Sequence, residues 1–243
     1  MRRGVADAPQ CSGYADGVPG VSESSRPVIL CPVEFERQRL LAAGLGDRAE
    51  IICTGPGAGR VVHWSETKGP FATRVILAGL AGALRDISRP GEAYLVGTVI
   101  SHDGRQFNAE PELRSEGLDG RHHRRAVVAS VPRVVTSAHE KRILADKTGA
   151  DLVDLESGVF AQAGAILGWR WSIVRGVSDG CDVSMPRDIE QWVGPDGRTR
   201  AMRASWSMVT HPWRIPGVFD LRRNARRAMD QVAEIIREML EAG

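Results

Sequence analysis

The sequence predicts a single α/β domain with a twisted, largely parallel or mixed central sheet that is flanked by helices. Short apolar runs recur along the chain, and helical segments separate several of them. The runs are continuously hydrophobic rather than alternating, which is typical of strands covered on both faces. Strands that alternate with helices in this way indicate a mostly parallel sheet between helical layers.

Seven apolar runs are the candidate buried strands. They are PVILCPV (27–33), EIICTG (50–55), RVILAGL (74–80), AYLVGTVI (93–100), AVVASV (126–131), DLVDL (151–155) and WSIVRGV (171–177). The candidate helices between them are residues 34–43, 138–148 and 157–168. The last of these is small and apolar nearly all round, which predicts a buried helix.

The C-terminal region predicts a long amphipathic helix over about residues 220–241. Apolar residues repeat there at helical spacing, and Asp220 suits the N-cap position. The preceding segment, 183–216, contains Trp192, Trp206 and Trp213. We interpret it as a helical or irregular excursion that packs into the core or against a second copy of the chain.

One domain is expected over residues 27–243, after a disordered tail over residues 1–26. The tail is rich in Gly, Ser, Pro and Ala and has almost no large apolar groups. Such a segment cannot bury enough surface to offset the entropy lost on ordering. The rest of the 243-residue chain is long enough for one α/β unit with a sizeable core.

The composition argues against several classes of binding partner and functional site. The formal net charge of +2 forces no wide basic surface, so nucleic acid is not an expected partner. The cysteines form no CxxC pair and the histidines show no metal-ligand spacing, so neither a disulfide framework nor a metal site is expected. No apolar run reaches the roughly 18 residues that span a bilayer, and a reducing cytoplasm fits the cysteine usage best.

Two acids follow successive predicted strands in the stretch DLVDLESGVFAQAGAILGWRWSIVRGVSDGCD, residues 151–182. Glu156 comes directly after the first strand and Asp179 after the second. In a right-handed βαβ unit both strands run the same way, so both acids should lie at one edge of the sheet. Ligands of open α/β sheets bind in the crevice outside this edge.

Two further segments are expected at the same edge. Glu36 follows the first strand, and the glycine-rich stretch AGLAGAL (78–84) is predicted to form a loop after the third. Three carboxylates beside a glycine loop suit a polar substrate such as a sugar better than a polyphosphate. A protonated carboxyl group can protonate a leaving group and a carboxylate can activate water, so the set suits cleavage of a glycosidic bond.

Each acid also has a structural interpretation. Asp179 could cap a following helix, Glu156 could complement the N-terminus of its own helix, and Glu36 could mark a surface helix start. The pairing of Glu156 with Asp179 across one βαβ unit favours the functional interpretation for these two.

The motifs CPVEFE, TGPGAGR, GLAGAL, VDLESG and RGVSDG, in this order, resemble those of the nucleoside phosphorylase and nucleosidase superfamily. By pattern, the chain is similar to methylthioadenosine/S-adenosylhomocysteine nucleosidases, futalosine hydrolases and hopanoid-associated phosphorylases. The resemblance covers residues 27–182, and the C-terminal part, DGRTR through IPGVFDLRRNARRA, is more weakly similar to the hopanoid-associated branch. It implies a nucleoside phosphorylase-like fold.

The resemblance also implies roles for individual residues. Asp179, preceded by Ser178, would protonate the purine at its imidazole nitrogen, and Glu36 would activate the attacking water. Glu156 would bind the ribose hydroxyls. The remaining substrate-binding positions implied are Leu155 beneath the sugar, where nucleosidases usually carry methionine, and the backbone of Ala81 and Gly82 beside the ribose and the nucleophile.

Two departures from the family pattern bear on the reaction. Phosphate-using members usually carry serine in the glycine stretch where this chain has Leu80, and leucine cannot donate a hydrogen bond to phosphate. Glu36 would also repel phosphate, so both positions favour hydrolysis. The segment Val131–Ser137 lacks the aromatic residue expected to stack on a purine, which leaves the base open.

The function expected is therefore hydrolytic cleavage of the N-glycosidic bond of a purine nucleoside or 5′-modified adenosine, and the resemblance implies no metal and no organic cofactor. Two alternatives stay open: phosphorolysis, including that of an adenosylhopane-type, lipid-linked nucleoside, and a nucleoside-binding module without turnover. The resemblance further implies a homodimer or higher homo-oligomer.

Overall fold

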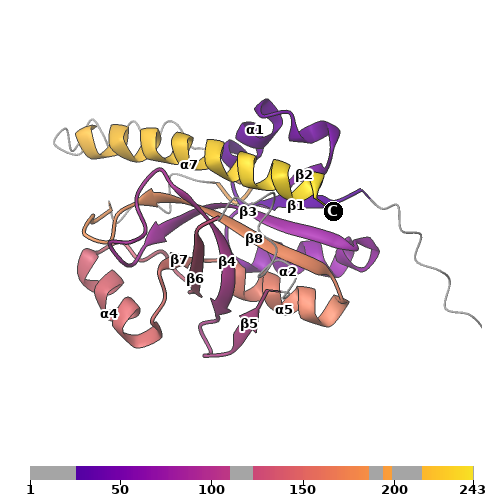
Figure 1. Ribbon diagram of the computed structural model, residues 1–243. Helices are drawn as coiled ribbons and strands as arrows, with labels where there is room; N and C mark the ends of the chain where they lie inside the picture. Colours follow the sequence, from indigo (N-terminus) through magenta and orange to yellow (C-terminus); the bar gives the residue numbers. More distant parts are fainter. Residues whose placement is uncertain (1–25, 110–122, 186–193, 199–214, 243) are drawn as a thin grey trace, which may run out of the picture.

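The structure is a computed structural model that describes residues 26–109, 123–185, 194–198 and 215–242. The tail expected over residues 1–26 lies outside the described residues except for Arg26, and so do Trp192, Trp206 and Trp213. Within the described residues, the chain forms one α/β unit in which helices cover a mixed sheet (Figure 1). The predicted fold class is confirmed.

Eight strands make up the sheet within the described residues. Their bounds are β1 Val28–Cys31, β2 Glu50–Cys53, β3 Arg74–Ala83, β4 Ala93–Ile100, β5 Gln106–Asn108, β6 Arg125–Ser130, β7 Leu152–Asp154 and β8 Arg170–Asp179. The seven predicted strands all appear, within a few residues of their expected ends. The three-residue β5 was not expected, because a strand this short leaves no readable period in the sequence.

The pairing of these strands closes a ring. β3 runs parallel to β1 and to β8, and β8 runs antiparallel to β4. β4 is parallel to β6, β6 is parallel to β7, and β7 returns to β3 in the antiparallel direction. The C-terminal end of β3 therefore pairs with two strands at once, since Gly82 lies opposite both Val153 of β7 and Asp179 of β8.

Helices lie on both faces of the sheet. They are α1 Glu34–Ala42, α2 Ala58–Thr67, α4 Ala138–Thr148, α5 Ser157–Leu167 and α7 Ile215–Glu241, with single 3₁₀ turns at η1 Leu45–Asp47 and η2 Gly69–Phe71. The long α7 crosses one face over β8 beside α1, and α2 packs against α5 on the other (Figure 1). No helix in the described ranges is long and apolar enough to pass through a membrane.

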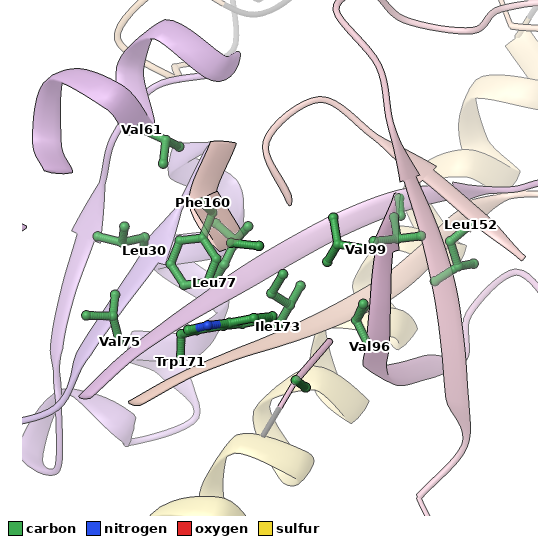
Figure 2. Close-up of a cluster of buried hydrophobic side chains, with 14 of the residues drawn as sticks. Leu30, Val61, Val75, Leu77, Val96, Val99, Leu152, Phe160, Trp171 and Ile173 are labelled. Carbon is green, nitrogen blue, oxygen red and sulfur yellow. The ribbon is translucent and has the colours of Figure 1, made fainter. Parts of the chain in front are cut away.

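Two hydrophobic layers explain why the strands are apolar on both sides. Successive residues of β3 point to opposite faces, so that Val75 and Leu77 pack with Phe160 of α5, while Ile76 packs with Met229 of α7. Figure 2 shows the first layer, in which Trp171 of β8 also lies. The continuous hydrophobic runs thus reflect two covered faces, as the sequence indicated.

Two expectations about local structure are wrong. The stretch 78–84 is not a loop, because β3 continues to Ala83 and pairs with β8 along this length. Its glycines serve close packing instead, since a Cβ on Gly79 would lie 2.8 Å from both Arg175 Nη1 and Glu36 Oε1. The C-terminal helix begins at Ile215, so Asp220 lies within α7 and pairs with Arg223 rather than capping the helix.

Candidate active site

A cavity of about 570 Å³ opens where the C-terminal ends of β3, β7 and β8 meet the first turn of α1. A volume of this size is within the usual range for small-molecule sites. All seven site residues named from the sequence line it: Glu36, Ala81, Gly82, Leu155, Glu156, Ser178 and Asp179. The structure thus brings together the whole predicted set.

The reason for this convergence differs from the one expected. β7 and β8 are not parallel neighbours, because β7 pairs antiparallel with β3 whereas β8 pairs parallel with it. Their C-terminal ends meet because both reach Gly82 of β3. A Cβ on Gly82 would lie 3.2 Å from Asp179 Oδ2 and 3.4 Å from Val153, so the missing side chain allows this close approach.

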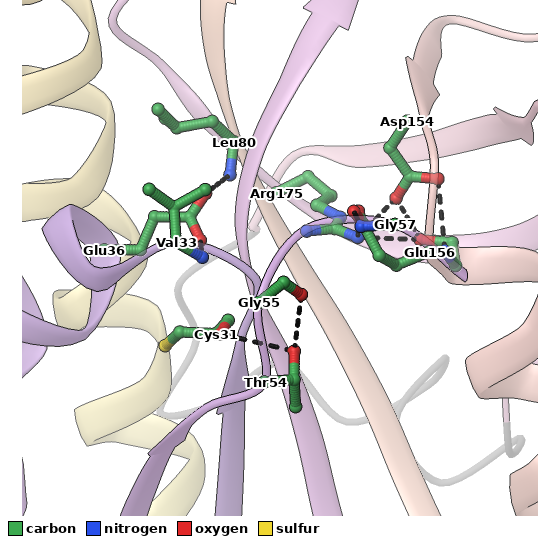
Figure 3. Close-up of polar contacts among 11 residues, drawn as sticks. Cys31, Val33, Glu36, Thr54, Gly55, Gly57, Leu80, Asp154, Glu156 and Arg175 are labelled. Carbon is green, nitrogen blue, oxygen red and sulfur yellow. Dashed lines mark hydrogen bonds and ion pairs between the residues drawn. The ribbon is translucent and has the colours of Figure 1, made fainter. Parts of the chain in front are cut away.

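Glu36 is 2% exposed and is held by two backbone amides (Figure 3). Its Oε2 accepts a 2.8 Å hydrogen bond from Val33 N, which caps α1, and its Oε1 accepts one of 2.8 Å from Leu80 N. The cap confirms the structural interpretation of this residue in part, while the bond to β3 fixes the carboxyl group at the cavity wall. Burial raises the pKa of Glu36 to about 7, against the opposing effect of these amides and of Arg175.

Glu156 is the N-cap residue of α5, but its side chain does not cap that helix. Instead, Oε1 accepts a 2.8 Å hydrogen bond from Gly57 N, and Oε2 lies 3.5 Å from Arg175 Nη2. Gly57 has a φ of +92°, which a glycine adopts without strain, and it lies in the turn that joins β2 to α2. Burial raises the pKa of Glu156, and the attraction of Arg175 opposes this effect.

Arg175 is fully buried in β8 and was not among the predicted site residues. Its Nη2 forms a 2.5 Å ion pair with Asp154 Oδ2 and lies 3.4 Å from Ser157 Oγ. Burial disfavours the charged guanidinium most strongly, but the attraction of Asp154, Glu156 and Glu36 together raises the pKa of Arg175. A sequence signal did exist, because an arginine within an apolar strand needs a buried acid as partner.

Asp179, which is 6% exposed, ends β8 with both carboxyl oxygens engaged. Lys141 Nζ donates to Oδ2 at 2.5 Å, and Ser178 Oγ lies 2.5 Å from Oδ1. No helix begins in the described residues that follow, 180–185, so Asp179 is not a helix cap there. Lys141 was also not predicted, because nothing in the pattern of α4 indicates what its buried side chain meets.

The rest of the cavity wall is mostly apolar. The segment 131–135, together with Val153, Leu155 and Met185, supplies mostly aliphatic side chains. Phe35 is the one aromatic residue among the described lining residues. A flat base would therefore lie against aliphatic groups in this part of the site rather than on a stacked ring. Among the described residues, no three His, Cys, Asp or Glu side chains are arranged to hold a metal ion.

A family model for the phosphorylase superfamily matches residues 46–210, more than half of the chain. The chain belongs to the phosphorylase superfamily. The resemblance drawn from its motifs is confirmed at this level. A search of curated proteins finds no match to this superfamily member.

Solved structures share the fold of this phosphorylase superfamily chain at low sequence identity. Futalosine hydrolase of Helicobacter pylori matches with a TM-score of 0.66 and 14% identity, over 89% of this chain and 97% of that one. The 5′-methylthioadenosine/S-adenosylhomocysteine nucleosidase of the same organism, in complex with a substituted pyrrolidin-3-ol, has a TM-score of 0.66 and 14% identity, over 89% of this chain and 98% of that one. S-adenosylhomocysteine nucleosidase of Streptococcus pyogenes gives 0.64 and 16%, over 91% and 98%.

Proposed function

We propose that the chain hydrolyses the N-glycosidic bond of a purine nucleoside or 5′-modified adenosine. The observation that carries this proposal is the convergence of Glu36, Glu156 and Asp179, each held by different partners, on one cavity. Membership of the phosphorylase superfamily and a fold shared with nucleosidases and futalosine hydrolase support it.

The three acids divide the work of the reaction. Asp179 gives a proton to the imidazole nitrogen of the base, so that the electron pair of the glycosidic bond leaves with a neutral base. Water adds to the oxocarbenium-like ribose and transfers its proton to Glu36. Glu156 accepts hydrogen bonds from the ribose hydroxyls, while Gly57 N fixes one of its oxygens. Proton exchange with solvent then restores Glu36 and Asp179.

The binding residues complete the site. Leu155 lies beneath the position of the sugar and offers it an apolar surface. The backbone of Ala81 and Gly82, at the end of β3, lies beside the ribose and the nucleophile. A leucine in place of methionine at position 155 keeps volume and apolarity, so the substitution leaves the sugar site intact.

Hydrolysis is favoured over phosphorolysis by the charge of the cavity wall. The carboxyl groups of Glu36, Asp154 and Glu156 lie near the guanidinium of Arg175, and all four groups are buried. Arg133, which also lines the cavity, is paired with Glu140. A phosphate dianion would enter a wall with more negative than positive groups. Leu80 presents no side-chain donor, and its backbone N–H is already bonded to Glu36.

The titration of Glu36 predicts the acid side of the pH profile. A base must be ionised to accept the proton of water, and the pKa of Glu36 is raised from 4.5 to about 7. We therefore expect kcat/KM for base release to rise with pH through about 7 in the wild type. Glu36→Gln should lower kcat by about 100-fold or more and lose this rise. A wild-type profile that is flat between pH 5.5 and 8.5 would contradict the assignment of Glu36 as the base.

The experiment that tests the function is release of free base from 5′-methylthioadenosine, S-adenosylhomocysteine, adenosine and inosine, each with and without phosphate. We expect release that does not depend on phosphate. Release that requires phosphate would show that the chain catalyses phosphorolysis rather than hydrolysis. Binding of these nucleosides without release would support the non-catalytic alternative, and failure to bind them would direct the search to a lipid-linked nucleoside.

The finer assignments belong to the same proposal. A purine base is proposed because it offers an imidazole nitrogen that Asp179 would protonate. A cytoplasmic location fits the free thiols of Cys31, Cys53 and Cys181. A homo-oligomer fits the exposed apolar side chains of Phe71 and Ile166.

A further inference from the structure

Lys141 is a fully buried lysine on α4, and its ammonium ends at the acid of the proposed site. Ser137 begins this helix, with its Oγ accepting a 3.1 Å hydrogen bond from Glu140 N. The cap fixes the helix so that Lys141 and Ala145, one turn apart, both face inward. Lysine is rarely buried without a partner, because the cost of removing its charge from water is high.

The partners of Lys141 match a charged amine. Nζ donates to Asp179 Oδ2 at 2.5 Å, to Gly180 O at 2.6 Å and to Val183 O at 3.1 Å. An ammonium has three protons and no lone pair, so three acceptors satisfy it completely. A neutral amine would direct its lone pair at one of these oxygens. The contacts therefore describe a cation whose three donors are all in use.

The other oxygen of Asp179 has a different environment. Ser178 Oγ lies 2.5 Å from Asp179 Oδ1 and 3.2 Å from Ala81 O. A hydroxyl has one proton, so Ser178 can donate to only one of these two oxygens at a time. When Oδ1 carries a proton, both contacts are satisfied, because Oδ1–H donates to Ser178 Oγ and the Ser178 hydroxyl donates to Ala81 O.

We propose that Lys141 is a positioning residue that directs the catalytic proton of Asp179 to Oδ1. A carboxyl oxygen that already accepts a short bond from an ammonium is the poorer site for a proton, so the proton is carried by the other oxygen. Until a base binds, Oδ1–H donates to Ser178 Oγ. In the complex it turns to the base nitrogen, while the Ser178 hydroxyl keeps its bond to Ala81 O. This inference rests on the proposed function and adds to it the residue that decides which oxygen acts.

The proton balance of the step is simple. The Oδ1–H bond breaks as the proton passes to the base nitrogen, and the glycosidic electron pair leaves with the base. Asp179 becomes a carboxylate at this moment, and the Lys141 ammonium beside Oδ2 stabilises the new negative charge. Lys141 keeps all of its own protons throughout.

A purely structural role is the competing explanation. Lys141 also bonds two carbonyl groups of the loop 180–183, and that loop is tied to the start of α4 through Met185 N and Thr136 O at 2.7 Å. In that case, loss of Lys141 would loosen the loop and affect every substrate alike. The test must therefore separate an effect on proton transfer from an effect on the loop.

The experiment combines a double-mutant cycle with two leaving groups. Lys141→Met and Lys141→Gln are each made alone and together with Asp179→Asn, and kcat and KM are measured with the best nucleoside and with p-nitrophenyl β-D-ribofuranoside. The nitrophenolate leaves as an anion and needs no proton. Lys147→Met is the matched control, because Lys147 is an exposed lysine on the same helix.

We expect Lys141→Met to lower kcat for the nucleoside by roughly 10- to 100-fold with little change in KM, as part of the contribution of a positioned acid. In the Asp179→Asn background, Lys141→Met should lower kcat for the nucleoside by less than about 2-fold, since the carboxyl group through which Lys141 acts is gone. With the nitrophenyl riboside, Lys141→Met should leave kcat almost unchanged. The double variant also keeps the test valid if Lys141→Met alone fails to fold, because it leaves no unpaired buried carboxylate.

The contradicting outcomes are distinct. Equal losses with both leaving groups, or losses that multiply with Asp179→Asn, would overturn the positioning role and support the structural one. Full activity of both Lys141 variants would overturn it as well. A wild-type protein that binds nucleosides but releases no base would instead contradict the proposed function itself, and the inference with it.

Discussion

Asp179→Asn is expected to lower kcat for base release by at least about 100-fold while KM changes little. Asparagine keeps the shape of the side chain and can still accept a hydrogen bond from Lys141, but it has no acidic proton for the leaving base. The loss should therefore fall on the chemical step rather than on binding. Steady-state kinetics with the best nucleoside of the panel, with single-turnover measurements of base release, will measure it.

The matched control for this change is Asp182→Asn. Asp182 is exposed on the loop just after β8 and does not line the cavity. It should keep nearly all of the wild-type activity. An Asp179→Asn protein that releases base at the wild-type rate would mean that the proton comes from another group or that the base leaves unprotonated.

Arg175→Met is expected to cause the largest loss of stability, about 3–5 kcal/mol in the free energy of unfolding. The change leaves the buried carboxyl groups of Asp154 and Glu156 without their cation. Burial already raises the pKa of Glu156, and loss of Arg175 removes the main effect that opposes this rise. A carboxyl group whose folded-state pKa is raised is most stabilising at low pH, so the variant should lose more stability at pH 8 than at pH 5.

Urea unfolding of the two proteins at both pH values measures this effect. Arg48→Met is the matched control, because Arg48 pairs with Glu241 at the surface and each side chain is about half exposed. An exposed pair of this kind contributes at most about 1 kcal/mol. A loss for Arg175→Met no larger than the control, or one equal at the two pH values, would show that the buried network does not depend on its arginine.

The sequence could predict those parts of the fold whose apolar residues follow a recognisable pattern because they are buried. Seven strands were readable because short, continuous apolar runs fill both covered faces of the sheet, and the helices over 34–43, 138–148 and 157–168 were readable as the segments that separate these runs. The direction of β7 was not readable, because a three-residue strand carries no sign of its partner. The stretch 78–84 was mistaken for a loop because glycine in a tightly packed strand looks the same as glycine in a turn.

The candidate site also contains residues that the sequence could predict and residues that it could not. Glu36, Glu156 and Asp179 could be found because each follows an apolar strand, where the end of the strand limits the side chain to one edge of the sheet. Arg175 and Lys141 could not be placed, because they reach the site from within β8 and from α4 through long side chains. Which acid each cation meets depends on tertiary packing over distances that no local pattern records.

The ring of strands β3–β8–β4–β6–β7 has a consequence for how the site is prepared for its ligand. Among the described strands, each member of this ring is bonded along two sides, so it cannot separate without breaking two ladders. Local opening of a protein begins where few such bonds resist it. Asp179 is the last residue of β8 and Glu156 follows β7 by two residues, so both belong to the part of the molecule that opens last. The ordering of these two carboxyl groups is then completed when the chain folds, and little of the binding energy of a nucleoside has to be used for it.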